Sequence, residues 1–456
     1  MSDSLLKKVQ AAVAGSAAAF RSRVTLQPAG GEGDKVFPPT YSGAVYATEK
    51  RRLPGHDDPV ECVLLDSVQS QANRIEEALQ DAVDEGRIQI PVVEVDFSDI
   101  PIVEPGQKAE GLFEPIGRVT SLEAPHRVAD AILRDSEFCD DQGKRTPFRE
   151  TPAGKKIGFA NLRNATPLFE ICPTALLLGL WDSTGPKGGL GTKFQRALVS
   201  EIIGVDASYG AKTSSRIDPL AIRKDSALIY ETPDRGWTLS SEEAAKDKSK
   251  KPIPKGKDGK PSEANHGNIV PDVSWEKDKN GNVVWYDRKE FSDLVYDAKQ
   301  GRWKRPVAGG VTIAYAEQMT VISLPALRRL QFPVNGKVSK EINDAGRTVL
   351  AALGLCGAVL AAERGLDLRS RCLLWPTAPL NWELLDRPGS KADSFELDGK
   401  RAIQLLVDAV KHAKDVGLSW MEEPLQLKPA KKLVELVCKS QRMAISSGDE
   451  GEGGEE

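Results

Sequence analysis

Histidine and cysteine are too sparse and too scattered in this sequence to indicate metal chemistry. Only four histidines occur among 456 residues, and no two of them stand three or four positions apart. A zinc-binding helix of the HExxH kind needs that spacing, so this class is excluded. The six cysteines form no CxxC pair and lie mostly among apolar residues, as reduced core thiols do. We therefore expect no metal site, no disulfide framework and no cofactor.

Long hydrophobic runs are also missing. The longest one, from Thr348 to Ala362, covers fifteen residues, fewer than the ~20 that a membrane-crossing helix needs. Near the N-terminus, Gln10, Gly15 and Ser16 interrupt an alanine-rich stretch and dilute any signal-peptide core. We expect a cytoplasmic protein without a membrane span.

The composition that remains is that of a globular chain of two or three packed units, with 40% apolar and 28% charged residues. The net charge is −4, but the last eight residues hold five acids and no base, so the rest of the chain carries +1. Phosphate binding depends on the clustering of bases rather than on the total charge, and basic clusters are present.

The hydrophobic pattern predicts strands interleaved with helices. Asp66 and Ser67 start a helix after the first strand, and Gly86 ends it. Asn280 and Gly281 mark a hairpin between two tryptophan-bearing runs. The segment 192–207 fits either a helix or a strand, and we favour a helix. The predicted strands are 60–65, 92–97, 118–122, 174–181 and 311–324, and the predicted helices are 3–20, 67–86, 125–135, 340–362, 400–416 and 431–441. Short strands separated by long polar insertions favour an α+β core of the split βαβ kind.

Two regions are expected to lie outside any regular element. The stretch from Leu26 to Tyr41 is rich in glycine and proline. Residues 246–260 hold seven lysines and two aspartates, with proline and glycine between them, which indicates a flexible excursion.

The helix start at 67–74 is crowded with hydrogen-bonding side chains, where backbone amides and the helix dipole already favour an anion. This pattern indicates a phosphate site. An ordinary helix cap followed by a solvated face explains it equally well. The residues are Ser67, Gln69, Ser70, Gln71, Asn73 and Arg74.

A glycine-rich loop follows the predicted strand 174–181. It does not match a P-loop, because Thr192 separates Gly191 from Lys193, and it has no GxGxxG spacing. Between Thr184 and Arg223 there are six bases and three acids, which suits contact with a sugar-phosphate backbone. A tight turn with solvated lysines is the alternative. The candidate backbone contacts are Lys187, Lys193, Gln195, Arg196 and Arg216.

Support for catalysis is lacking. His126 and Arg127 open a predicted helix, where His126 could act as a general base or a phosphate ligand, although a lone capping histidine is commoner. The sequence has no GxSxG elbow and offers no triad. We expect a protein that is not an enzyme, with His126 and Arg127 as candidate phosphate contacts.

Aromatic and basic residues mix around the predicted hairpin, as they do in proteins that bind single strands. Tryptophans that face each other across a hairpin are as often cross-strand packing. The pattern leaves both interpretations open for Trp275, Trp285, Tyr286 and Trp303.

Four segments together resemble the backbone subunit of type I-G (formerly I-U) CRISPR effector complexes, of the RAMP superfamily. The resemblance runs from about Leu26 to Pro333. The segments are VLLDSVQSQANRIEEAL, EAPHRVADAILRD, LLLGLWDSTGPKGGLGTKFQRALVSEIIG and NHGNIVP, in this order.

This resemblance implies a modified RRM-type or ferredoxin-like palm with finger and thumb-like insertions. Copies would stack head to tail along a CRISPR RNA and present its spacer for pairing with target DNA. The further partners would be a large subunit, a guide-processing subunit and a separate helicase-nuclease that cleaves. By analogy, the candidate contacts at 67–74, 126–127 and 187–196, together with Arg216, would bind the RNA. Asn265, His266 and Asn268 would lie in a thumb-like or inter-subunit region.

The expected organisation follows from pattern and resemblance together. It comprises an N-terminal helix and extended segment (1–59), the palm with inserted loops (60–235), the lysine-rich thumb-like excursion and hairpin (236–306), a returning strand with C-terminal helices (307–445), and an acidic tail (446–456). Two other functions compete with this one: a metal-independent RAMP-type ribonuclease that uses His126 or His266 as a base, and a generic single-strand RNA-binding protein.

Overall fold

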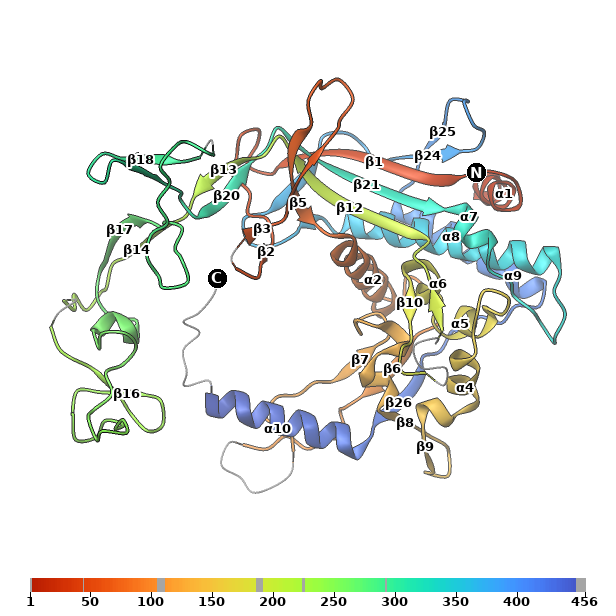
Figure 1. The fold of residues 1–456 in the computed structure, drawn as a ribbon. Coiled ribbons are helices and arrows are strands. Elements are labelled where there is room, and N and C mark those ends of the chain that lie inside the picture. Colours follow the sequence, from red (N-terminus) through yellow and green to blue (C-terminus); the bar gives the residue numbers. More distant parts are fainter. Residues whose placement is uncertain are drawn as a thin grey trace. The chain divides into compact units, whose positions relative to one another are not determined.

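The computed structural model describes residues 2–43, 45–104, 111–185, 192–223, 226–291 and 293–447. The chain forms two compact units that interleave along the sequence. Unit 1 comprises Met1–Glu32, Leu64–Val205 and Tyr315–Arg442, and unit 2 comprises Gly33–Val63, Asp206–Ala314 and Met443–Glu456. Helices and strands are both abundant, which confirms the predicted α+β class (Figure 1).

The main sheet of unit 1 is centred on three long antiparallel strands, in the order β1, β21, β12. Strands β23 and β22 extend it beyond β1, β5 adjoins β12, and β24 pairs with the start of β1 and with β25. The bounds are β1 Ala19–Pro28, β5 Val60–Asp66, β12 Leu198–Val205, β21 Tyr315–Ser323, β22 Leu366–Asp367, β23 Leu373–Pro376, β24 Asn381–Leu385 and β25 Asp393–Glu396.

A smaller sheet of unit 1 has the order β7, β6, β26, β8, β9. Strand β26, near the C-terminus, runs parallel to β6 and antiparallel to β8. A separate hairpin, β10 with β11, flanks the glycine-rich loop. The bounds are β6 Val93–Asp96, β7 Arg118–Thr120, β8 Ser136–Cys139, β9 Arg145–Pro147, β10 Leu180–Trp181, β11 Lys193–Phe194 and β26 Leu425–Pro429.

Helices pack around α8, which contacts α1, α2, α6, α7 and α9. The bounds are α1 Ser2–Ala14, α2 Val68–Asp84, α3 Ala131–Arg134, α4 Pro152–Gly158, α5 Thr166–Ile171, α6 Thr174–Leu178, α7 Leu324–Arg328, α8 Lys340–Glu363, α9 Gly399–Asp415 and α10 Lys431–Ser447, with short 3-10 turns η1 Arg127–Ala129 and η2 Phe148–Glu150. The long helices α2, α8, α9 and α10 confirm their predictions, whereas the helix predicted at 125–135 is only the turns η1 and α3.

Helix α2 begins and ends where the sequence predicts. The hydroxyl of Ser67 accepts a hydrogen bond from the backbone N–H of Ser70 at 3.2 Å, which is an ordinary N-cap. Gly86 follows the helix with φ +69°, a conformation that glycine adopts without strain. The buried face of α2 contacts β12 and α8.

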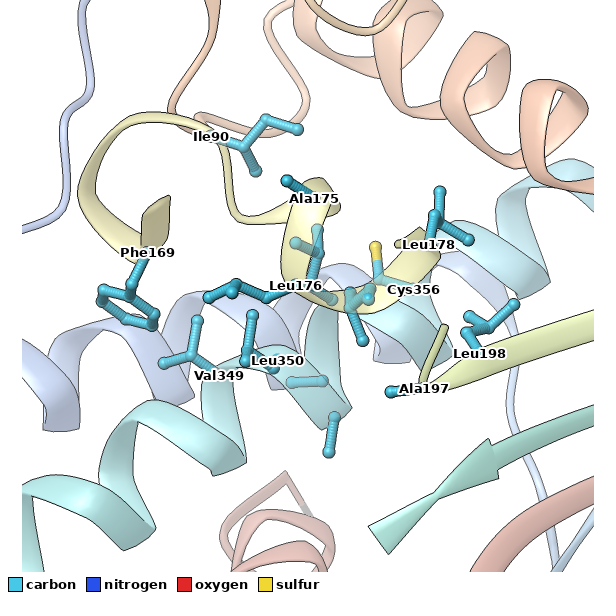
Figure 2. Close-up of a cluster of buried hydrophobic side chains, with 14 of the residues drawn as sticks. Ile90, Phe169, Ala175, Leu176, Leu178, Ala197, Leu198, Val349, Leu350 and Cys356 are labelled. Atoms are coloured by element: carbon cyan, nitrogen blue, oxygen red, sulfur yellow. The ribbon is translucent and has the colours of Figure 1, made fainter. Parts of the chain in front are cut away.

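Helix α8 forms the centre of the core. By length and composition it could cross a membrane, but 78% of its most apolar window is buried inside the protein, as in a core helix. Figure 2 shows Leu176 and Leu178 of α6 beside Val349, Leu350 and Cys356 of α8. At Gly357, a Cβ atom would lie 2.8 Å from Ile75 of α2, so glycine is what lets these two helices approach closely.

Several other sequence predictions are wrong. The stretch 26–41, expected to lie outside any regular element, contains the end of β1 up to Pro28 and the short strand Thr40–Tyr41. The run 174–181, predicted as one strand, is the helix α6 followed by β10, and Gly179 with φ +93° separates them. The segment favoured as a helix at 192–207 contains the strand β12, whose alternation places Ser200 in the core and Val199 outside. The N-terminal helix ends at Ala14 instead of residue 20, because Ala19 and Phe20 already belong to β1, an inner strand of the main sheet.

Unit 2 consists of short ribbons. The hairpin turn predicted at Asn280 and Gly281 is confirmed: Gly281, with φ +81°, donates to the carbonyl of Asp278 at 2.9 Å. The predicted strand 311–324 is divided between β20 and β21. The bounds are β2 Thr40–Tyr41, β3 Val45–Tyr46, β4 Thr48–Arg51, β13 Ser208–Ala211, β14 Thr213–Arg216, β15 Tyr230–Glu231, β16 Trp237–Thr238, η4 Pro261–Ala264, β17 Ile269–Val273, β18 Val295–Asp297, β19 Arg302–Lys304 and β20 Ala308–Thr312.

Candidate nucleic-acid interface

The start of α2 encloses a buried carboxylate. Asp66 is fully buried at the end of β5, and its Oδ2 accepts from Gln71 Nε2 at 2.6 Å and from Arg74 Nε at 2.9 Å. Arg369 adds a longer ion pair of 3.5 Å to Oδ1. Arg74 also donates to the backbone carbonyl of Leu368 at 2.6 Å. This network fixes the strand-to-helix turn to the segment before β23.

Gln71 extends the same network into the sheet. Its Oε1 accepts from Ser200 Oγ and from Gln318 Nε2, both at 2.8 Å, and the side chain is 3% exposed. Among the candidate contacts at this helix start, Gln69 and Asn73 are exposed, and Ser67, Ser70 and Arg74 are partly buried. Gln71 and Arg74 therefore form hydrogen bonds within the protein, whereas Gln69 and Asn73 lie on the surface.

Arg127 is buried in a bidentate ion pair. Its Nε and NH2 groups each lie 2.7 Å from a carboxylate oxygen of Glu76, and its NH1 donates to the carbonyl of Gly179 at 3.1 Å. Burial raises the pKa of Glu76 to about 7 even though Arg127 acts in the opposite direction. Arg127 is 7% exposed, whereas His126 beside it is exposed. Arg127 therefore links α2 to the turn η1 that precedes α3, and its side chain is not available at the surface.

Arg196 lies close to that ion pair. It donates from Nε to the carbonyl of Leu178 at 3.1 Å. Its burial lowers its pKa, and the charge of Arg127 adds to that lowering. Arg127 and Arg196, 69 positions apart in the sequence, are thus brought together around Glu76.

Lys193 and Gln195 lie at the base of the glycine-rich loop. Lys193 is exposed on β11 opposite Trp181 of β10, and its Nζ lies 5.5 Å from the centre of the Trp181 ring. Gln195 is also exposed and accepts from Arg329 NH1 at 2.8 Å. Lys187 falls outside the residues that the structure describes. This hairpin presents a cation and a large aromatic ring together.

The thumb-like candidates Asn265, His266 and Asn268 lie in unit 2, and Arg216 contacts the turn that carries them. Arg216 donates to the carbonyls of Gly267 and His266, each at 2.9 Å. Asn268 Oδ1 accepts from the backbone N–H of Asp218 at 2.6 Å, and the His266 ring lies 5.7 Å from Trp237. Asn265 is exposed, with φ +57°. Arg216 therefore braces the turn that carries Asn265, His266 and Asn268.

The aromatic residues around the hairpin of unit 2 pack on basic side chains. Lys304 Nζ lies 4.0 Å from the ring centre of Trp275 and 5.7 Å from that of Trp285. Tyr286 and Trp303 form a β-bridge, and Tyr286 donates from its hydroxyl to Glu276 at 2.9 Å. These four aromatic side chains are partly buried, so packing within the unit accounts for them.

Sequence reasoning missed several residues of these sites. The sequence indicates Asp66 only as part of a helix start, and it does not single out Glu76. Trp181 and Phe159, 60% and 55% exposed, were not singled out. Trp181 ends an apolar run and Phe159 follows a short helix, and neither position gives a sequence signal of exposure.

Both the metal-ligating side chains of these clusters and the groups that reach the surface bear on what the clusters can bind. Across the described ranges, no group of three or more histidine, cysteine, aspartate or glutamate side chains is placed to hold a metal ion. The groups that reach the surface are amides, hydroxyls, cations and aromatic rings, which suit contacts with phosphate, ribose and base faces.

Residues 20–209 match the family described as CRISPR-associated protein GSU0053 (Cas_GSU0053). This match supports the interpretation that the chain is a CRISPR-associated protein. Such a protein is consistent with a role in CRISPR defence. The matched region includes the α2 start, the Glu76–Arg127 pair and the β10–β11 hairpin. No curated protein matches the chain.

Proposed function

We propose that the chain is a non-catalytic backbone subunit that binds CRISPR RNA in a type I-G Cascade complex of the RAMP superfamily. The observation that carries this proposal is the match of residues 20–209 to a CRISPR-associated family. The exposed hairpin that carries Lys193 lies inside the matched region. In this proposal the α+β core of unit 1 is a modified RRM-type palm, and unit 2 supplies thumb-like or inter-subunit contacts.

The chemistry of the surface supports display of a guide strand. A displayed guide must be held by its phosphates and riboses, since its base edges have to pair with target DNA. Exposed Gln69, Asn73, His126, Lys193 and Gln195 offer such contacts without a base-reading pocket. Gln71 and Arg127 are buried, so their part in the proposal is to hold the exposed residues in place.

Copies of the chain would stack head to tail along the RNA in the cytoplasm. The proposed partners are the CRISPR RNA, the target DNA strand, a large subunit and a guide-processing subunit, with a separate helicase-nuclease recruited for cleavage.

The test is to purify the tagged chain together with its genomic neighbours and to sequence the bound RNA. Spacer-repeat transcripts protected as a regular ladder are the expected result. Random RNA in the same preparation points instead to a generic single-strand binder, and absence of nucleic acid contradicts the proposal.

The non-catalytic part has a test of its own. RNA incubated with the purified protein should stay intact, and a matched His126→Ala or His266→Ala preparation should behave in the same way. Cleavage by the wild type that His126→Ala or His266→Ala abolishes would establish the ribonuclease alternative.

A further inference from the structure

Two loops of unit 1 that carry exposed aromatic residues are joined at their bases. The hydroxyl of Thr192, just before β11, lies 3.2 to 3.3 Å from the carbonyl oxygens of Ile157, Gly158 and Ala160 at the end of α4. Thr192 also accepts through its own carbonyl from the backbone N–H of Asp182 at 2.9 Å. The β10–β11 hairpin and the loop after α4 are therefore held as neighbouring parts of one surface.

Further contacts hold the same surface together. Asp182 is buried and pairs with Arg149 at 2.8 Å. Arg329 donates to Gln195, and the backbone of Gln331 donates to the carbonyl of Leu162 at 2.8 Å. Figure 1 shows α4, α5 and β10 in one region of unit 1. We call this surface the hairpin surface, comprising residues 149–164, 181–185, 192–196 and 329.

Two large aromatic rings stand out on the hairpin surface. Trp181 is 60% exposed and Phe159 is 55% exposed, whereas Phe169 nearby in the sequence is fully buried in the core. A large exposed ring is not by itself evidence of a partner, because Trp375 on β23 is 66% exposed as well. What distinguishes Trp181 is the cation beside it, with Lys193 Nζ 5.5 Å from the ring centre. An open cup of about 610 Å³ adjoins Phe159 and is also lined by Lys155, Lys156 and Asn164.

The charge of the hairpin surface favours an anion. Five of its bases reach solvent, namely Lys155, Lys156, Arg163, Lys193 and Arg329. The described acids of the surface are Glu150, which is exposed, and Asp182, which is buried against Arg149. Glu170, which lines the cup, is partly buried. Cations interleaved with aromatic rings are the arrangement with which proteins hold a single strand by its phosphates and base faces.

We infer that Trp181 and Phe159 stack on bases of a single-stranded nucleic acid whose phosphates lie along Lys193, Lys155 and Lys156. The inference rests on the proposed function and adds a second kind of contact to it. Stacking uses the face of a base and leaves its pairing edge free, so it is compatible with display of a guide. It is also insensitive to sequence, because every base has such a face.

The test separates stacking from phosphate binding. Dissociation constants are measured for Trp181→Leu and Phe159→Leu with a single-stranded RNA, with an abasic RNA of the same length, and with DNA of the same sequence. Each variant should weaken binding to the intact RNA by roughly 5- to 150-fold, the range that loss of one stacked base gives. On the abasic strand the variants should bind like the wild type, whereas Lys193→Ala should weaken binding to both strands.

Matched variants complete the design. Trp181→Phe should restore most of the affinity, because a phenyl ring can still stack. Trp375→Leu is the control, since Trp375 is 66% exposed but lies on β23 of the main sheet. Its affinity should be unchanged. Equal affinities for RNA and DNA would show that only bases and phosphates are contacted. A preference for RNA would show an additional ribose contact. Both results agree with stacking.

The outcomes distinguish the two proposals. If the wild type binds RNA but Trp181→Leu and Phe159→Leu bind equally well, the stacking inference fails and the proposed function stands. The same holds if the leucine variants lose equal affinity for the abasic strand, because the loss then has nothing to do with bases. If the wild type carries no nucleic acid at all, the proposed function fails.

Discussion

Replacing Arg127 by methionine should destabilise unit 1, because it leaves Glu76 buried without its partner. Glu76 is 2% exposed and Arg127 is 7% exposed, and two hydrogen bonds of 2.7 Å join them. Removing one member of a buried, bidentate ion pair costs about 3 to 5 kcal/mol. Methionine has a similar length, so the loss reports the missing charge and donors more than a cavity. The carbonyl of Gly179 loses a donor as well.

The effect should depend on pH with a defined sign. Burial raises the pKa of Glu76 from its ordinary 4.5 to about 7, so the folded protein binds more protons than the unfolded chain between these values. Stability from this group is therefore fully present below about pH 4.5 and falls as the pH rises through 7, by about 3 kcal/mol in total. Arg127 lowers this pKa, so Arg127→Met should raise it further and extend the fall to higher pH.

The assay is urea unfolding at about pH 5.5 and about pH 8, together with hydrogen exchange of α2 peptides. The local measurement is needed because a chain of two compact units need not unfold in one step. Arg127→Met should lose more stability at the higher pH. The double variant Arg127→Met with Glu76→Met should recover most of the loss, because it removes both charges of the buried pair.

A nearby surface pair provides the control. Arg134 pairs with Asp135 at 3.0 Å, and its side chain is 33% exposed. Arg134→Met should therefore cost less than about 1 kcal/mol. The reasoning is refuted if Arg127→Met costs no more than this control, or if the double variant is as unstable as the single one.

Three further predictions follow from the fold and the hairpin surface. Lys193→Ala should weaken RNA binding by the same factor for different spacer sequences and reduce the slope of log affinity against log salt by about 0.7, measured by filter binding; a loss confined to some spacers would contradict a phosphate contact. Leu176→Ala, at a side chain that is 1% exposed beside α8, should cost about 3 to 5 kcal/mol in urea unfolding. Ser67→Ala removes the α2 cap and should cost about 1 kcal/mol, whereas Ser67→Asp should restore it.

The elements that sequence reasoning predicted correctly are those that local signals determine. Ser67 and Gly86 bracket α2 by capping and by a left-handed backbone, both of which act within a few residues. Long helices such as α8 and α9 carry enough turns for their apolar period to be recognised. The α+β class followed from the interleaving of these elements.

The failures occur where partners distant in sequence decide the conformation. The segment of β12 fits both periods, and its pairing with β21, more than a hundred residues away, selects the strand. The short apolar run before Trp181 has no period of its own, and packing of α6 on α8 makes it a helix. A single sequence contains no record of these contacts.

The candidate site shows the same division at the level of side chains. Gln71 and Arg127 have the chemistry that binds phosphate, and the pattern around them predicted that use. The fold instead turns both inward, where their donors satisfy Asp66 and Glu76. A buried carboxylate needs such donors, since an unpaired charge in the core is far more costly than an unused donor at the surface. Trp181 shows the converse, because the fold leaves this large aromatic side chain 60% exposed instead of packing it in the core. Residue type therefore limits which interactions a side chain can make. Burial decides whether it makes them with the protein itself or with a ligand at the surface.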